Sequence, residues 1–203
     1  MKKLKIKTQK LRNLQILRFS INFQNIVESK TNIVNGLIID FYDPNNPPTD
    51  KDLINAALAD HKRGDYTKAK ERFKRALTVS EDDQNKQKCY TMLYDIALKR
   101  KAYKEAYSLT SSMTDNCIAY ERKARAVAAS ANDCGTSALE RSLVYCLALD
   151  YAEKACGKIG AATLNAWKGS LLPKKDLIML DVVNGSEHQV SCWSTKVKLR
   201  TRD

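Results

Sequence analysis

From Lys51 onward, apolar residues recur every three or four positions for about a hundred residues, which is the spacing of helices that bury one face. The first such stretch ends at Gly64, and a second begins at Tyr66. A polar run separates this pair from a third stretch over 90–98, and a fourth begins at Tyr103. The sequence therefore predicts two successive helical hairpins.

The two predicted hairpins repeat each other. The distance from Tyr66 to Tyr103 is 37 residues, and so is the distance from Ala69 to Ala106. A single hairpin cannot bury its apolar face alone, so repetition at this period is typical of stacked arrays. We therefore expect a mainly α fold, a short α-solenoid of helical hairpins.

A third pair of helices is expected after the second hairpin. Residues 118–131 form an alanine-rich helical pattern, and 137–156 form a longer one. Ser137 and Glu140 have the spacing of a capping box at the start of the longer helix. Residues 161–168 add a short helix.

The pattern changes in residues 171–203. Short apolar runs at 177–180 and 189–193 flank Asn184-Gly185, a strong signal for a hairpin turn. Basic and apolar residues alternate over 196–200, which favours a half-exposed third strand. We expect a small C-terminal antiparallel β-hairpin or three-stranded appendage, packed on the last helices so that it covers the end of the stack.

Residues 1–47 lack the helical pattern, and a proline-rich breaker over 43–50 separates them from it. Local alternation favours short strands, whereas the charge run is typical of a partly disordered segment, and both interpretations stay open. We therefore divide the chain into a basic N-terminal segment (1–47), a helical repeat domain (51–170) and a β-appendage (171–203).

The formal net charge of +12 is concentrated toward the two ends of the chain. The first 27 residues contain seven basic side chains and no acidic one. Such an arm can attract nucleic acid or an anionic membrane, although a solvated tail is the alternative. A second basic stripe would lie on one face of the last strand, but it lacks the interleaved aromatic residues of single-strand binders. Its members are Lys196, Lys198, Arg200 and Arg202.

Nothing in the chain approaches the roughly 18 consecutive apolar residues that a membrane-spanning helix needs. Residues 11–23 are interrupted by polar side chains, unlike an export signal. We expect a cytoplasmic protein, or a periplasmic or envelope protein if the N-terminus is misassigned.

No arrangement of catalytic side chains stands out. Asp60 and His61 are adjacent, so they do not share a helix face. The six cysteines form no CxxC pair, and Cys and His are not clustered as zinc ligands are. We expect no enzymatic activity, no cofactor and no bound metal.

When the two hairpins are aligned, their first helices would present four polar residues on the concave face: His61, Lys62, Asp95 and Lys99. This mixed set could hold a peptide carboxylate or an acidic segment of a partner. A solvated face is the alternative interpretation.

The stretch from Gly64 to Leu77 closely resembles the second half of a tetratricopeptide repeat (TPR). The packing signature of that family is a turn glycine, a tyrosine, a small residue, an aromatic residue and a second alanine. Here these positions hold Gly64, Tyr66, Ala69, Phe73 and Ala76.

The second copy of the repeat is degenerate. It matches at Tyr103 and Ala106, while Lys101 replaces the turn glycine. The resemblance implies hairpins that pack through their alanines, and a surface that binds a protein or peptide.

A second resemblance covers the C-terminal part. Residues 130–136, the following helix and the ending Val190-Ser191-Cys192-Trp193 are similar to a group of largely uncharacterised bacterial TPR proteins, many of which look like envelope proteins. This resemblance singles out Cys134 and Cys192, as a disulfide between appendage and helical loop or as a thiol site. A disulfide would not persist in a reducing cytoplasm. Trp193 is expected to anchor the appendage.

These observations predict a non-catalytic scaffold that binds an unidentified protein or peptide through a helical-repeat surface. The alternative is a basic protein that associates with nucleic acid or anionic membranes through its charged termini. The sequence does not predict the oligomeric state.

Overall fold

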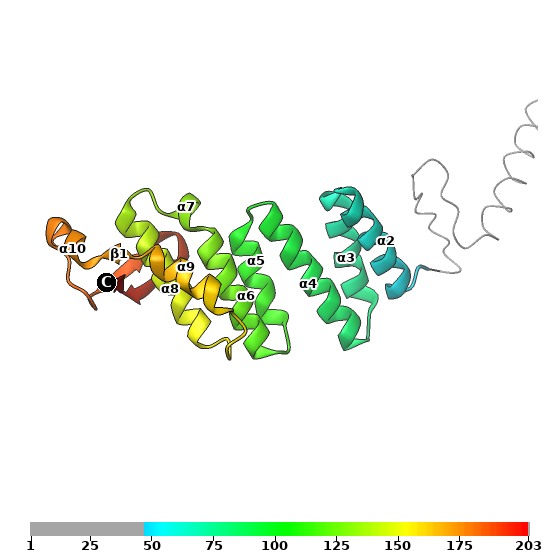
Figure 1. The fold of residues 1–203 in the computed structure, drawn as a ribbon. Helices are drawn as coiled ribbons and strands as arrows, with labels where there is room; N and C mark the ends of the chain where they lie inside the picture. Colours follow the sequence, from blue (N-terminus) through cyan, green and yellow to red (C-terminus); the bar gives the residue numbers. More distant parts are fainter. Residues whose placement is uncertain (1–46, 203) are drawn as a thin grey trace, which may run out of the picture. The chain divides into compact units, whose positions relative to one another are not determined.

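Helical hairpins follow one another along the stack in chain order (Figure 1). The computed structural model describes residues 47–202, and the predictions for the basic N-terminal segment lie outside these residues. The main helices are α2 (Asp50–Arg63), α3 (Tyr66–Val79), α4 (Asp83–Lys99), α5 (Tyr103–Leu109), α6 (Asn116–Ala129), α7 (Ala131–Cys134), α8 (Ala138–Glu153) and α9 (Ala161–Gly169). The mainly helical fold predicted from the sequence is confirmed.

Local capping residues delimit the first hairpin. The Thr49 side chain accepts a hydrogen bond from the Asp52 amide, and the Asp52 carboxylate accepts one from the Thr49 amide, which completes a capping box. Helix α2 ends at Gly64, whose φ of +83° is a left-handed conformation that glycine adopts without strain. Asp65 then caps α3 through the Lys68 amide. Two helices are thus joined by a tight turn.

Equivalent positions in the two hairpins are fully buried. Ala69, Phe73 and Ala76 of α3 pack with Ala57 of α2 in one apolar cluster. In the second hairpin, Ala106 of α5 is likewise fully buried. Alanine lets helix axes approach closely, and the phenylalanine ring fills the remaining space. The arrangement is that of a short helical repeat.

The third pair consists of α6 and α8, with the four-residue α7 between them. Leu143 of α8 and Val127 of α6 belong to the largest apolar cluster of the described residues. The predicted capping box is confirmed, since Ser137 accepts from the Glu140 amide and Glu140 accepts from the Ser137 amide. Hydrogen bonds from Thr136 and Ser137 lower the pKa of Glu140 to about 2.

Short strands and one helix follow the stack. They are β1 (Leu172–Pro173), α10 (Lys174–Leu180), β2 (Glu187–Val190), β3 (Thr195–Lys198) and β4 (Thr201–Arg202). Strands β2 and β3 form an antiparallel hairpin in which Val190 lies opposite Thr195. Strand β1 pairs with β4 in parallel. The expected small antiparallel hairpin is confirmed, and β3 packs against α8.

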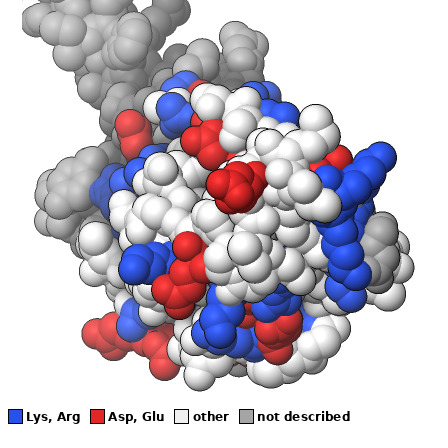
Figure 2. Space-filling view, turned by 90° about the vertical axis from the view of Figure 1, so that its left-hand side faces the viewer, with Lys and Arg blue, Asp and Glu red and all other residues white. Residues whose placement is uncertain are grey.

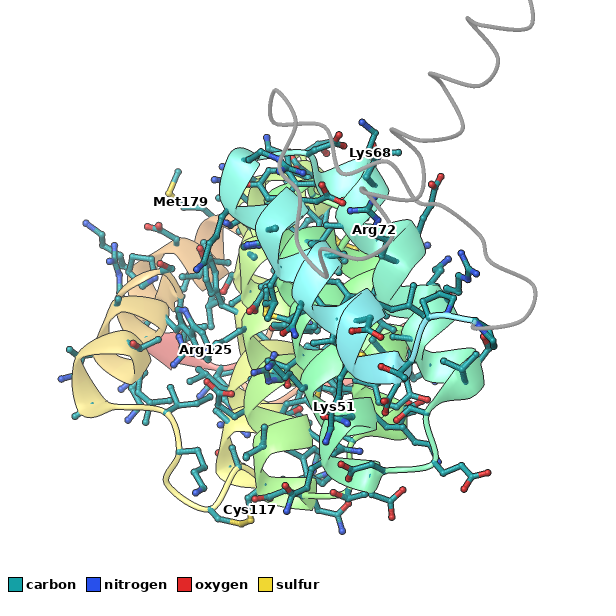
Figure 3. All side chains as sticks on the ribbon, turned by 90° about the vertical axis from the view of Figure 1, so that its right-hand side faces the viewer. Lys51, Lys68, Arg72, Cys117, Arg125 and Met179 are labelled. Carbon is teal, nitrogen blue, oxygen red and sulfur yellow. A yellow bond between two sulfur atoms is a disulfide. The ribbon has the colours of Figure 1, made fainter. Side chains whose placement is uncertain are left out.

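The strand predicted at 177–180 is wrong, because these residues form the end of α10. Pro173 has a φ of −63° at the N-cap, and Asp176 lies in the first turn, both of which favour a helix start. Leu177 is buried, whereas Ile178 and Met179 are 86% and 87% exposed. Figure 3 shows Met179 extending outward from the ribbon.

The predicted position of the hairpin turn is also wrong. Gly185 has a positive φ of +86° and donates its amide hydrogen to the Leu199 carbonyl, but it does not join two paired strands. The turn of the hairpin lies instead at 191–194, where a short 3-10 helix follows Val190. Ser194 closes this turn in the left-handed region.

Within residues 47–202, no helix combines the length and the apolarity needed to cross a bilayer.

Candidate functional site

Polar side chains from α2, α4 and α6 come together near the start of α3. We call this group the first-helix cluster, and its members are His61, Asp95, Lys99 and Arg122. The Lys99 ammonium donates to the Tyr66 hydroxyl at 3.2 Å and lies 5.0 Å from the centre of its ring. The His61 ring meets the Tyr66 ring edge-on at 5.3 Å between centroids. In the same cluster, Arg122 Nη1 lies 3.7 Å from Asp95 Oδ1, which is closer to an ion pair than to a hydrogen bond.

Tyr94 positions Arg122 in this cluster. The Arg122 guanidinium carbon lies 4.8 Å from the centre of the Tyr94 ring, a cation–π contact. The Tyr94 hydroxyl donates to the Arg122 carbonyl oxygen at 2.8 Å. Burial raises the pKa of Tyr94, so the hydroxyl keeps its proton. Tyr94 stands 37 residues after Ala57, where the repeat would have a small residue, and it provides the surface on which Arg122 lies.

Three nitrogen atoms of the cluster are buried without a hydrogen-bond partner among the described residues. They are His61 Nε2, Arg122 Nε and Arg122 Nη1. A buried polar atom left without a partner costs about 1–3 kcal/mol, so native structures contain few of them. His61 and Arg122 therefore keep hydrogen-bonding atoms that the described residues leave unused.

Burial also shifts the acid–base equilibria of the cluster. Burial first, and then the charge of Lys99, lowers the pKa of His61, against an opposing effect of Asp95. Burial raises the pKa of Asp95, and Arg122 is the main opposing influence. At neutral pH the imidazole is therefore uncharged, and the fixed positive charges are those of Lys99 and Arg122.

Three of the four residues predicted for the partner-binding groove come together in this cluster. His61 and Asp95 interact electrostatically, and the charge of Lys99 lowers the pKa of both. Lys62 is exposed at the end of α2 and makes no hydrogen bond or ion pair with the rest of the described chain. The sequence prediction missed Arg122, because the third helix pair lacks the glycine and tyrosine that align the first two hairpins.

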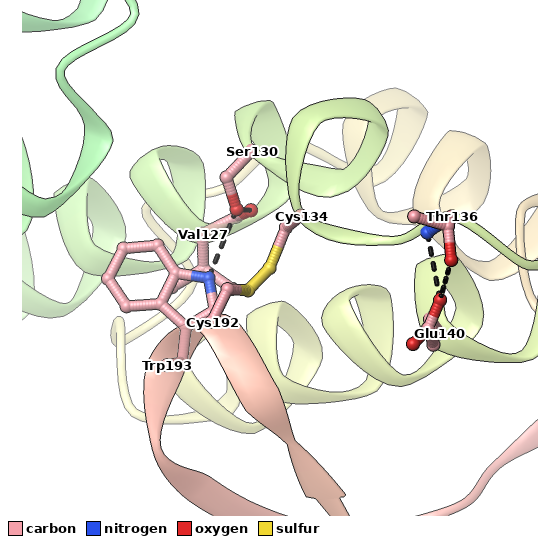
Figure 4. The surroundings of a disulfide bond; sticks show 7 residues. All are labelled: Val127, Ser130, Cys134, Thr136, Glu140, Cys192 and Trp193. Atoms are coloured by element: carbon pink, nitrogen blue, oxygen red, sulfur yellow. Dashed lines mark hydrogen bonds between the residues drawn. A yellow bond between two sulfur atoms is a disulfide. The ribbon is translucent and has the colours of Figure 1, made fainter.

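Four of the six cysteines form two disulfides. Cys134 of α7 is bonded to Cys192 after β2, with 5.7 Å between their Cα atoms (Figure 4). Cys117 at the start of α6 is bonded to Cys156 after α8, with a Cα separation of 5.5 Å. The two remaining cysteines, which are buried and unpaired, are Cys89 and Cys146.

The second of these bonds was not predicted, although helix topology explains it. Helices α6 and α8 pack on each other and run in opposite directions, so the start of one meets the end of the other. Cys117 is the second residue of α6, and Cys156 follows α8 by three residues. An antiparallel helix pair with a cysteine at each of these ends is a signal that sequence reasoning could have used.

A pocket of about 320 Å³ opens beside the Cys134–Cys192 bond. Trp193 forms one wall, and its indole N–H donates to the Ser130 hydroxyl at 3.0 Å (Figure 4). The indole also lies 5.1 Å from the Tyr107 ring, between centroids. Trp193 thus attaches the β-hairpin to the helices and lines the pocket at the same time.

The basic stripe predicted for the C-terminal strand is divided between elements and partly paired. Arg200 donates to Asp150 and Glu153 of α8, and Arg202 donates to the carbonyl of Gly169. Figure 2 views the left-hand end of the stack and shows basic and acidic side chains interspersed on it. This face therefore presents no extended surface of a single charge.

The described residues thus carry two candidate binding sites, the first-helix cluster and the pocket beside the Cys134–Cys192 bond. Within residues 47–202, no group of three or more His, Cys, Asp or Glu side chains is placed to hold a metal ion. Comparisons of the chain with protein-family models, curated proteins and solved structures found no match.

Proposed function

We propose that this protein is a non-catalytic interaction scaffold of the tetratricopeptide type, which binds an acidic segment of a protein or peptide at the first-helix cluster. The observation that carries the proposal is the Arg122 guanidinium, which has two nitrogen atoms without a hydrogen-bond partner among the described residues and belongs to a side chain that is still 18% exposed. A carboxylate supplies the acceptor that the guanidinium lacks, and hydrogen bonds between charged groups are stronger than neutral ones. Lys99 would add a second positive charge beside the same carboxylate.

Preorganisation supports this assignment. Arg122 lies against Tyr94, and Lys99 lies against Tyr66, so both cations are held before a partner arrives. Long side chains that are already held in place lose less conformational entropy when a partner binds. The contact of 3.7 Å between Arg122 and Asp95 is long, so a partner carboxylate can form a better hydrogen bond than Asp95 does.

A matched pair of variants tests the proposal. Arg122→Met removes the guanidinium but leaves a side chain that can pack on Tyr94, and Lys74→Met removes one exposed positive charge from α3. The probe is a fluorescently labelled octapeptide of Asp, Glu and Ala, titrated by fluorescence anisotropy against the full chain. The control peptide has Asn and Gln in place of the acids.

We expect the acidic peptide to bind the wild-type protein and Lys74→Met alike. Arg122→Met should weaken the binding at least about tenfold, because loss of a buried charged hydrogen-bond partner costs about 2 kcal/mol or more. Absence of saturable binding, or equal affinities for wild type and Arg122→Met, would refute the assignment of this site.

We also propose that the protein works in an oxidising compartment such as the periplasm or cell envelope, rather than in the cytoplasm. The two disulfides support this location, since glutathione and thioredoxin keep cytosolic thiols reduced. Protein isolated from its native cells should be denatured and alkylated without reductant, and then weighed by mass spectrometry. We expect two alkylated cysteines of the six, whereas six would exclude this location.

Binding to nucleic acid or anionic membranes through the charged termini has less support within the described residues. Arg200 and Arg202 already have protein partners there. The basic residues of the N-terminal segment lie outside the described residues. Affinity for nucleic acid that falls steeply with salt, and that is lost on deletion of residues 1–27, would favour this alternative.

A further inference from the structure

Lysine occupies a glycine position at the rim of the pocket beside the Cys134–Cys192 bond. Lys101 has a φ of +57° in the turn between α4 and α5, and Gly64 has a φ of +83° in the corresponding turn between α2 and α3. A side chain in this left-handed region is disfavoured by steric repulsion, and such residues concentrate at functional sites. Lys101 in this strained turn lines the pocket.

At the rim of the pocket, the ammonium group of Lys104 has no ion-pair partner among the described residues. Asp133 accepts a hydrogen bond from the Tyr103 hydroxyl at 3.0 Å and lies 3.9 Å from the Lys101 ammonium. Glu105 forms an ion pair with Lys70 at 2.6 Å. Both rim carboxylates are therefore engaged, whereas Lys104 is exposed and has no ion-pair partner in the described part of the chain.

The walls of the pocket are suited to an aromatic ring. Trp193 and Tyr103 provide aromatic surfaces, and the Cys134–Cys192 bond provides polarisable sulfur. Aromatic rings pack favourably against other rings and against sulfur. The volume of about 320 Å³ is at the lower end of the range for ligand pockets, which fits one large side chain better than a cofactor.

We propose that this pocket receives an aromatic side chain of a partner segment, with a neighbouring acidic residue of that segment paired to Lys104. The inference rests on the proposed function as a scaffold and adds a second point of contact. The pocket is built from α5, α7 and the hairpin, whereas the first-helix cluster belongs to α2, α4 and α6. The two contacts can therefore be tested independently.

The experiment is a titration of the ¹⁵N-labelled full chain, followed by ¹H–¹⁵N correlation spectra. The probe is the capped tripeptide Asp-Phe-Asp, and the controls are Asn-Phe-Asn and Asp-Ala-Asp. We expect saturable shifts of the Trp193 indole N–H and of the amides from Ala102 to Glu105 with the probe. Lys104→Glu should weaken binding at least about threefold by charge reversal at an exposed site, while Lys158→Glu, on a loop outside the pocket, should match wild type.

Three results would overturn the inference. The first is the absence of saturable shifts at these positions, including shifts confined to His61, Asp95 and Arg122, which would assign the peptide to the first-helix cluster. The others are equal binding of the probe and either control peptide, and equal affinity of Lys104→Glu and wild type. Failure at the pocket would leave the octapeptide test of the cluster unaffected, so the two proposals can fail separately.

Discussion

Removal of the Cys134–Cys192 bond should reduce the stability of the protein strongly without preventing its folding. The bond joins residues 58 positions apart and encloses α8, α9 and α10. For a loop of this length, the entropy of closure in the unfolded chain corresponds to about 4 kcal/mol at 25 °C. The variant Cys134→Ser/Cys192→Ser should therefore lose about 2–4 kcal/mol of unfolding free energy, as native disulfides commonly contribute.

The folded state should survive because other contacts hold the appendage in place. Val190, Val197 and Leu199 are buried in the same apolar cluster as α8. The Trp193 indole also donates a hydrogen bond to the Ser130 hydroxyl, a contact that does not involve the sulfur atoms. The effect of the substitution should consequently lie mainly in the unfolded chain.

Urea unfolding, followed by circular dichroism at 222 nm, measures this difference between the oxidised wild type and the double variant. A parallel titration of both proteins with reductant is the control, because the bond is then absent from each and their midpoints should nearly coincide. Equal urea midpoints under oxidising conditions would refute the reasoning. A difference that persists in reductant would instead come from the serine substitutions.

Three further predictions follow from other residues. Asp60, which is 1% exposed, is paired with both Arg72 and Arg63, so Arg72→Met removes one of its two cations and should lower the unfolding free energy in urea by about 2 kcal/mol; a loss below about 0.5 kcal/mol would contradict this. Because folding lowers the pKa of His61, the unfolded chain takes up the proton first, and the stability of the protein should fall as the pH drops below 6.5. Lys99→Met should raise the pKa of His61 in an NMR titration, and an unchanged pKa would exclude the charge of Lys99 as a cause. Ile178→Glu should change the unfolding free energy by less than about 0.5 kcal/mol, since this side chain is 86% exposed, and a large thermal destabilisation would show that its apolar surface is covered.

The helical hairpins could be predicted because their signals are local. Gly64 ends one helix, and Ala69, Phe73 and Ala76 mark the buried face of the next at helical spacing. The run at 177–180 was too short for its period to distinguish a strand from a helix, and the preceding proline was the informative residue. For an element this short, the residues that flank it are more informative than its own pattern.

The candidate sites were predictable only in part, because they combine residues from several elements. His61, Asp95 and Lys99 could be brought together by aligning one hairpin on the other. Arg122 lies in a helix pair with no such alignment, and its orientation depends on the buried Tyr94 ring. The pocket beside the Cys134–Cys192 bond depends on the way the hairpin docks, which no local pattern encodes.

The two disulfides interlock along the chain, since Cys134 lies inside the loop closed by Cys117 and Cys156, while Cys192 lies outside it. A single backbone cut anywhere between Cys117 and Cys192 consequently leaves both pieces covalently joined. Cuts in the overlap between Cys134 and Cys156 leave them joined by both bonds. The N-terminal hairpins have no such link, so proteolytic nicking would release fragments from that end of the described chain while the C-terminal half remained one covalent molecule.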